Sequence, residues 1–188
     1  MNREEALALL HAKMQNQNLR RHCYAVAAVM KSLAKKLSGE SDSWEIAGIL
    51  HDADYEITKD NAKTDHVLLV VSWLKDQGVD QEIIDAIFSH GWKFVEGCPE
   101  PSSTFGWALY TCDELTGLIT ACALVRPEKK LSAVTVESVQ KKWNQKAFAA
   151  GVNRDQIALC EAKLGIPLPD FIQLSLSAMQ GISDELGL

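Results

Sequence analysis

Two side-chain types that bind divalent metals, imidazole and carboxylate, recur at intervals along this 188-residue chain. The adjacent pair His51-Asp52 has His22 upstream and Asp113 downstream. Each of these residues lies in a segment whose apolar spacing predicts a helix. Imidazoles and carboxylates from three helices can hold a catalytic divalent ion while leaving exchangeable coordination positions open. The spacing therefore points to a metal-dependent hydrolase.

Two further histidines extend this set. His66 and His90, like His22 and His51, lie on predicted helices at positions that can face inward. A lone buried histidine is usually a core residue with satisfied hydrogen bonds, but four of them with two interior aspartates leave many polar groups to pair in a helical core. A bound metal resolves that problem. His66 is the weakest of the four, because a residue in a first helical turn can face solvent.

The elements that would position these residues are all helical. Apolar residues recur with helical spacing along nearly the whole chain, and no segment shows the sustained alternation of a half-buried strand, so the predicted fold is all-α. The helices expected to carry the metal ligands span residues 18–37, 42–52, 64–77, 80–90 and 105–125, with a loop at 55–61. Three more helices, at about 135–150, 153–164 and 170–186, are expected to pack on this bundle.

Composition excludes several classes of protein. With 25 acidic and 19 basic residues, the formal charge of -6 gives no general attraction for a nucleic-acid polymer or an anionic membrane. The N-terminal MNREEALALL lacks the pattern of a secretory signal, and the longest apolar run, residues 67–74, is too short to cross a bilayer. The five scattered cysteines argue against a disulfide framework. We expect a cytoplasmic protein with reduced cysteines.

The order of His22, His51-Asp52 and Asp113 on successive predicted helices resembles the HD superfamily of metal-dependent phosphohydrolases. The similarity covers about residues 19–123. The run AGILHD at 47–52 is similar to the small and apolar segment before the superfamily's histidine-aspartate pair. The run IFSHG at 87–91 is similar to the segment that supplies a later histidine in its two-metal members. We expect a single domain over residues 1–188, with an HD-like metal-binding core at 18–125 and a C-terminal helical extension at 127–188.

This resemblance implies a ligand set and an activity. A first metal would be held by His22, His51, Asp52 and Asp113, and a second by His66 and His90, with Asp52 bridging the two. Mixed imidazole and carboxylate ligands suit iron, manganese, cobalt or zinc, as one or two ions, better than calcium. The predicted reaction is cleavage of a phosphomonoester or phosphodiester of a small nucleotide-like molecule by a metal-activated water that Asp52 positions.

The residues that bind the substrate are less well defined by the sequence. The isoleucine-glycine that commonly follows the pair in the superfamily is replaced by Ala53-Asp54, and the lysine that some members place there is missing. Arg126 and Lys130 are candidates for holding the phosphate, and Trp92 for stacking on a base, although each also suits an ordinary surface or packing role. Two alternatives stay open: a di-iron oxygenase on an HD-like scaffold, and a non-catalytic binding or signalling module stabilised by its metal.

Overall fold

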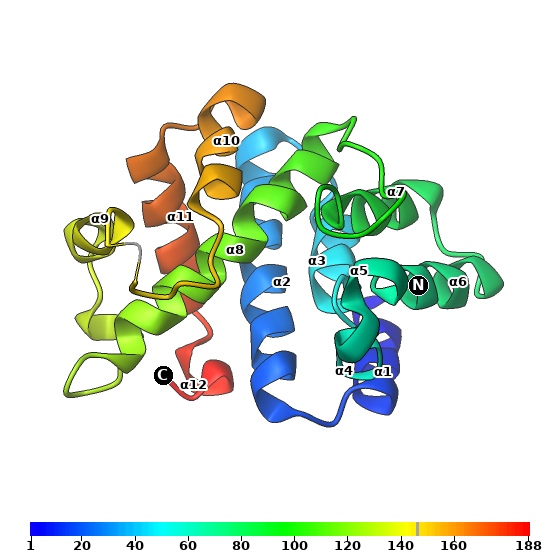
Figure 1. Ribbon diagram of the computed structural model, residues 1–188, viewed down its shortest axis with the longest axis horizontal. Helices are drawn as coiled ribbons and strands as arrows, with labels where there is room; N and C mark the ends of the chain where they lie inside the picture. The colour runs from blue at the N-terminus through cyan, green and yellow to red at the C-terminus, as the bar shows by residue number, and fades with distance from the viewer. Residues whose placement is uncertain (146) are drawn as a thin grey trace.

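The computed structural model describes residues 1–145 and 147–188, and every element in this part of the chain is helical, which confirms the all-α prediction. Two long helices, α2 (Gln17–Leu37) and α8 (Thr104–Leu124), pass side by side through the middle of the molecule (Figure 1). One side of this pair is built from α1 (Arg3–Lys13), α3 (Ser41–Leu50), α4 (Tyr55–Thr58), η1 (Lys59–Asn61), α5 (Ala62–Asp65), α6 (Leu68–Asp76) and α7 (Gln81–His90).

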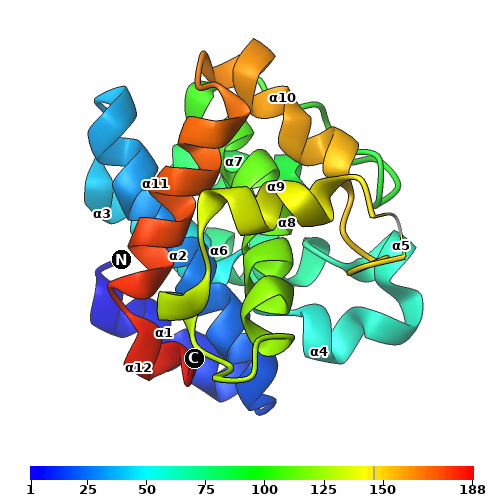
Figure 2. The same ribbon diagram turned by 90° about the vertical axis from the view of Figure 1, so that its left-hand side faces the viewer.

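The C-terminal helices cover the other side. They are η2 (Leu131–Ala133), α9 (Val136–Trp143), α10 (Arg154–Leu164), α11 (Leu168–Gln180) and α12 (Ser183–Leu186). In Figure 2, α9 and α11 lie over α8 and α2, and α10 packs along α8. The predicted helix at 135–150 ends early at Trp143, and residue 146 lies outside the described residues. The predicted helix at 170–186 is two helices, because the chain turns at Gly181.

The close approach of α2 and α3 fixes the first two candidate ligands relative to each other. Asn16 begins α2 by accepting hydrogen bonds from the backbone N–H groups of Asn18 and Leu19, at 2.9 and 3.2 Å. Farther along, Gly48 of α3 lies so close to α2 that a Cβ atom on it would be 2.5 Å from Ala27 Cα. Only glycine permits this contact between the two backbones.

The segment after α3 differs from the sequence prediction. The expected loop at 55–61 is α4 followed by η1, and the expected helix at 64–77 is broken into α5 and α6. Val67 at the break has a φ of 62°, a left-handed conformation that β-branched residues rarely adopt. The break turns His66 inward, so that this side chain is buried and does not face solvent.

None of the helices described for this chain combines the length and apolar character that a membrane span requires.

Candidate metal centre

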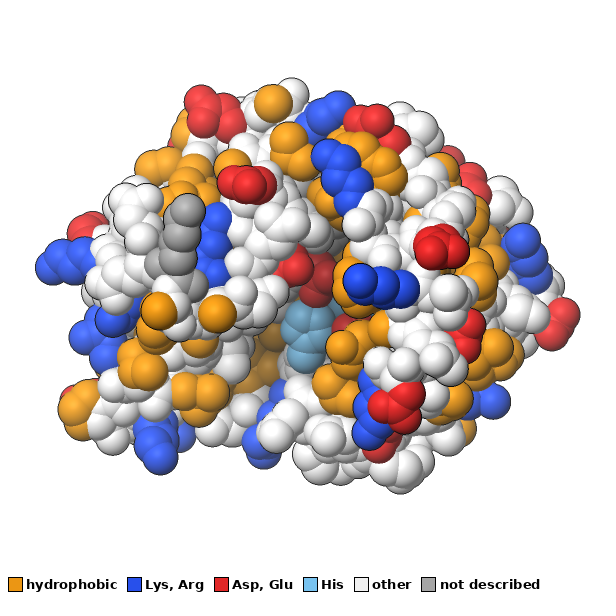
Figure 3. Space-filling model, viewed as in Figure 1, with side chains coloured by type: hydrophobic (Ala, Val, Ile, Leu, Met, Phe, Trp, Pro, Cys, Tyr) orange, Lys and Arg blue, Asp and Glu red, His pale blue; other side chains and the backbone are white. Residues whose placement is uncertain are grey.

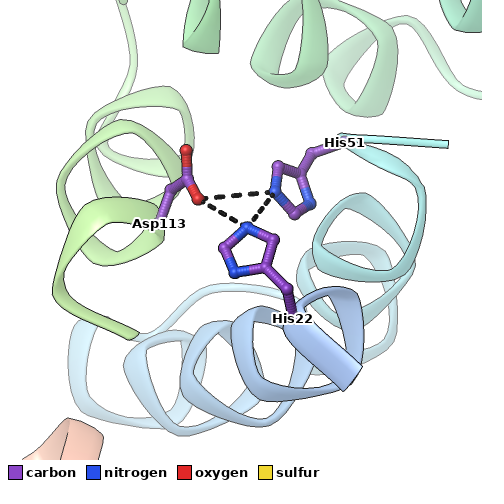
Figure 4. Close-up of side chains that lie close together, drawn as sticks. All are labelled: His22, His51 and Asp113. Atoms are coloured by element: carbon purple, nitrogen blue, oxygen red, sulfur yellow. Dashed lines mark hydrogen bonds and ion pairs between the residues drawn. The ribbon is translucent and has the colours of Figure 1, made fainter. Parts of the chain in front are cut away.

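The first group of candidate ligands joins three helical segments. His22 comes from the second turn of α2, His51 directly follows the last residue of α3, and Asp113 comes from the middle of α8 (Figure 4). The Nε2 atom of His22 lies 2.9 Å from Asp113 Oδ1 and 3.3 Å from His51 Nε2. His51 Nε2 lies 3.5 Å from the same Asp113 oxygen. Three ligand atoms thus surround one small space.

Asp52 joins this group to a second one. Its Oδ1 atom lies 3.2 Å from His66 Nε2, 3.4 Å from His90 Nε2 and 3.6 Å from His51 Nε2. Its other oxygen, Oδ2, lies 3.6 Å from His22 Nε2. The structure therefore brings together all six residues that the sequence analysis named as metal ligands, with the Asp52 carboxylate between the two groups.

All four imidazoles have the same orientation, with Nδ1 hydrogen-bonded outside the cluster and Nε2 directed at the carboxylates. Three of the outer contacts are His51 Nδ1 to Gly48 O at 2.9 Å, His90 Nδ1 to Ile87 O at 2.8 Å and His66 Nδ1 to Asp54 Oδ1 at 2.8 Å. The fourth involves Thr116, whose hydroxyl donates to Asp113 O at 2.8 Å and so accepts from His22 Nδ1 at 3.3 Å. Outer acceptors of this kind hold the proton on Nδ1 and leave the Nε2 lone pair facing inward.

This arrangement fits a cation better than a set of ordinary core histidines. In the tautomer that the outer contacts favour, each Nε2 is an acceptor, and it faces carboxylate oxygens that are also acceptors. Acceptors at these distances need positive charge between them, supplied either by extra protons or by metal ions. The donor set of imidazole nitrogens and carboxylate oxygens is the one that divalent transition metals prefer.

In the absence of metal, the close approach of imidazole Nε2 atoms and carboxylate oxygens shifts the pKa values of these side chains. Burial lowers the pKa of His22, but its hydrogen bond and attraction to Asp113 outweigh burial and raise the pKa to about 9. Burial likewise lowers the pKa of His66, and hydrogen bonds to Asp52 and Asp54 raise it to about 10. Burial raises the pKa of Asp52 and of Asp113, yet the adjacent histidines hold both well below the ordinary value. The cluster attracts positive charge.

Asp54 is a functional residue that the sequence analysis noted only as a departure from the superfamily pattern. Its side chain is fully buried, and besides accepting from His66 Nδ1 it accepts from the backbone N–H of Val70 at 3.2 Å through Oδ2. A carboxylate behind a metal-binding histidine fixes the tautomer and the orientation of the ring. The only signal in the sequence is an acid two residues after the histidine-aspartate pair.

A cavity of about 310 Å³ opens onto the cluster. Figure 3 shows this hollow near the centre of the face, with a histidine side chain at its base and acidic side chains beside it. The aromatic rings of Tyr55 and Phe94 line it and stand edge-on to the His66 ring, with centroids 5.2 and 6.4 Å away. Among the described residues that line the cavity, none is a lysine or an arginine.

The residues predicted to bind substrate lie elsewhere. Arg126 follows the end of α8 and lines a separate hollow with Lys141, while Lys130 lines another beside α12. Trp92 is half-buried against Trp107, with ring centroids 5.7 Å apart, and is not among the residues that line the cavity. Their roles in substrate binding therefore stay predictions.

Glu114, which the sequence analysis did not single out, does line the cavity. Its Oε2 atom accepts a hydrogen bond from the backbone N–H of Asn153 at 3.0 Å. Burial and the negative charge of neighbouring Asp113 raise the pKa of Glu114 to about 7. No pattern in the sequence marks this residue apart from its position next to a predicted ligand.

A helical bundle that gathers four imidazoles and two carboxylates into one cluster beside a cavity is typical of proteins with a histidine-aspartate metal site. Residues 19–117 match the family model described as HD domain, and the chain belongs to this family, part of the HD superfamily of metal-dependent phosphohydrolases. All six candidate ligands lie within the matched residues.

Curated relatives cover only part of the chain. It is 34% identical over 92 residues to a protein named Ribonuclease Y from Helicobacter acinonychis (strain Sheeba) and, to the same extent, to Ribonuclease Y from Helicobacter pylori (strain ATCC 700392 / 26695). Each match covers 46% of this chain and 17% of the relative, so it spans less than a fifth of the relatives' length.

Proposed function

We propose that this protein is a metal-dependent phosphohydrolase that cleaves a phosphomonoester or phosphodiester of a small nucleotide-like molecule. The observation that carries the proposal is the convergence of four imidazole Nε2 atoms on two carboxylates, with Asp52 Oδ1 between 3.2 and 3.6 Å from three of them. Membership in the HD superfamily supports hydrolysis as the type of reaction. The net charge of -6 favours a small substrate over an RNA polymer, although the curated relatives are named ribonucleases.

The ligand set divides between two ions. His22, His51, Asp52 and Asp113 would hold the first, and Asp52, His66 and His90 the second, with iron, manganese, cobalt or zinc as suitable metals. Divalent ions bound here supply Lewis acidity and lower the pKa of water near the substrate.

Side chains and backbone groups of the protein hold the candidate ligands in place and would orient the attacking water. The hydrogen bonds at the four Nδ1 atoms keep the imidazole rings from rotating, so their Nε2 atoms stay directed at the carboxylates of Asp52 and Asp113. Asp52 lies between the two ligand groups and would orient the attacking water through its carboxylate. Tyr55 and Phe94 narrow the cavity beside the cluster and reduce the access of bulk water.

The test compares Asp52→Ala with Asp42→Ala, which removes an exposed acid ten positions earlier. Each purified variant is supplied with manganese, iron, cobalt or zinc and assayed against a panel of small phosphomonoesters and phosphodiesters. We expect turnover in the wild type and in Asp42→Ala, and none in Asp52→Ala, with the helical circular dichroism of all three alike. Full activity in metal-loaded Asp52→Ala contradicts the proposed mechanism.

The same ligand set also suits a di-iron oxygenase, the second candidate. The specific observation in its favour is that no lysine or arginine is found among the described cavity-lining residues, because an uncharged substrate needs no basic partner. Oxygen consumption by the reduced iron-loaded protein, without phosphate release, would support this candidate. If a small phosphorylated molecule raises the melting temperature of the protein but is not hydrolysed, the result would support the third alternative, a non-catalytic binding module.

A further inference from the structure

One wall of the cavity comes from the C-terminal part of the chain, beyond the residues that match the HD domain model. Gly151 and Gln156 line the cavity, and α10, which carries Gln156, packs against α8, which carries Asp113. The matched region ends at residue 117, so this wall, residues 148–156, is an addition to the family core.

The wall is held in place by specific hydrogen bonds. The Arg154 guanidinium donates to the backbone carbonyls of Ala149 at 2.6 Å and Val152 at 2.7 Å, and also to that of Phe148. The Asn153 side chain caps α10 by accepting from the backbone N–H of Gln156 at 3.2 Å. A turn tied at several carbonyls presents its cavity-lining groups in a fixed position.

Two residues that line the cavity, Glu114 and Gln156, each keep one side-chain oxygen without a hydrogen-bond partner among the described residues. Glu114 uses Oε2 to accept from the Asn153 N–H, and its Oε1 has no hydrogen-bond partner among the described residues. Gln156 uses Nε2 to donate to the backbone carbonyl of Tyr110 at 2.7 Å, and its Oε1 likewise has no partner among those residues. These acceptors lie beside the ligands Asp113 and His22, which line the same cavity.

We propose that Glu114 and Gln156 each accept a hydrogen bond from a different hydroxyl group of the substrate, which is therefore an organic phosphate with two hydroxyl groups and a single phosphate group. The inference rests on the proposed phosphohydrolase function and narrows its substrate class. A hydroxyl donates to a carboxylate oxygen in a strong, charge-assisted hydrogen bond. A second phosphate at this wall would face the carboxylate of Glu114, which holds no metal ion in the proposed ligand set, and no lysine or arginine of the described lining would offset its charge.

The test uses three probes: glycerol 1-phosphate, n-propyl phosphate, which lacks the two hydroxyl groups of the first probe, and n-propyl diphosphate, which adds one phosphate to the second. The wild type should hydrolyse glycerol 1-phosphate with a kcat/KM about tenfold above that for n-propyl phosphate, which corresponds to about 1.4 kcal/mol. Gln156→Leu and Glu114→Gln should each lower this ratio toward one by lowering only the glycerol 1-phosphate value. Glu114→Gln should also raise kcat/KM for n-propyl diphosphate, because a negative charge is removed.

The control is Glu161→Gln, which removes an equal charge from an exposed position on α10, the helix of Gln156, and should leave all ratios unchanged. A merely structural role of the wall would lower kcat/KM for all three probes in parallel, and that result would overturn the proposal. Equal wild-type turnover of glycerol 1-phosphate and n-propyl phosphate would overturn it as well.

Failure of the proposed function is distinguishable from failure of this inference. If no probe is hydrolysed, the dissociation constants of glycerol 1-phosphate and n-propyl phosphate are measured by calorimetry on the metal-loaded protein. If glycerol 1-phosphate binds about tenfold more tightly than n-propyl phosphate and Gln156→Leu loses this difference, the result would support hydroxyl recognition by Glu114 and Gln156 even without hydrolysis. Equal binding, or no binding of either probe, would overturn it.

Discussion

Replacing Asp54 by Asn tests how the second group of ligands is held. Asp54 accepts two hydrogen bonds, from His66 Nδ1 at 2.8 Å and from the Val70 N–H at 3.2 Å, with one carboxylate oxygen for each donor. The amide of Asn has nearly the same shape but only one accepting oxygen. One donor must therefore lose its acceptor. If the amide nitrogen faces His66, the ring is driven to the tautomer with the proton on Nε2, the atom that faces Asp52.

We expect Asp54→Asn to weaken binding of the second ion, the one assigned to Asp52, His66 and His90, and to leave binding of the first ion unchanged. Loss of a residue that orients a metal-binding histidine typically lowers the affinity for the metal by about 10- to 100-fold, which corresponds to about 1.4 to 2.7 kcal/mol of binding free energy. The first group, His22, His51 and Asp113, makes no hydrogen bond to Asp54 in the described structure. Its ion should bind Asp54→Asn with wild-type affinity.

Calorimetric titration of the metal-free protein with manganese or zinc measures both steps. The control is Asp60→Asn, an exposed acid six positions away, which should bind both ions normally. The nitrogen chemical shifts of the His66 ring in the metal-free protein report the tautomer independently of metal binding. The reasoning is refuted if Asp54→Asn binds both ions as the wild type does, or if both affinities fall by the same factor.

Three further outcomes follow from the structure. Gly48→Ala should lower the free energy of unfolding by about 1 to 3 kcal/mol in urea titrations, because its Cβ meets Ala27 Cα at 2.5 Å; an unchanged midpoint would contradict this packing. The pKa values of His22 and His66 are raised from 6.5 to about 9 and about 10, so the stabilisation that these two histidines give the metal-free protein should be fully present below pH 6.5 and be lost as the pH rises through 9 and 10, while metal affinity increases over the same range. Proton release on metal binding at pH 7, measured by calorimetry in two buffers of different ionisation enthalpy, checks this; affinity independent of pH between 6 and 9 would refute it. Removal of metal by a chelator should lower the melting temperature by about 5 to 10 °C, the equivalent of about 2.7 kcal/mol for an ion present at 100 times its Kd; a constant melting temperature would show that no stabilising ion had been bound.

The helices that carry His22, His51, Asp113 and His90 could be predicted because helical periodicity is a local property. His22 lies four residues before Val26 on the stripe of α2 that continues through Met30 and Leu33, so its inward direction follows from 3.6 residues per turn. The two aspartates were predicted to face the interior because ligands from separate segments must meet for any of them to bind a metal. The structure brings all six together.

The environment of His66 could not be predicted, because it depends on contacts between residues far apart in the sequence. The predicted helix is interrupted at Val67, a β-branched residue with a positive φ, and neither a glycine nor a proline marks this position in the sequence. The hydrogen bond from the Val70 N–H to Asp54 spans 16 residues and helps hold this irregular backbone.

The wall at residues 148–156 could not be predicted either, because it too depends on contacts between residues far apart in the sequence. Gln156 meets the Tyr110 carbonyl across 46 residues, and Asn153 meets Glu114 across 39. A glutamine on a helix and an acid next to a ligand have no pattern of their own in the sequence. Arg126 and Lys130 were candidates for the phosphate because they follow the Asp113 helix, but a long helix carries its C-terminal end away from a site at its middle.

The central claim, that these histidines and aspartates form a two-metal centre, is tested most directly by elemental analysis of wild-type and Asp52→Ala protein, purified freshly under anaerobic conditions. Asp52 is the carboxylate between the two ligand groups, so its loss should affect both ions. The account predicts about two transition-metal ions per wild-type chain and a clear deficit in Asp52→Ala. A wild-type protein that takes up no transition metal, or an Asp52→Ala protein that retains the full wild-type content, would contradict it.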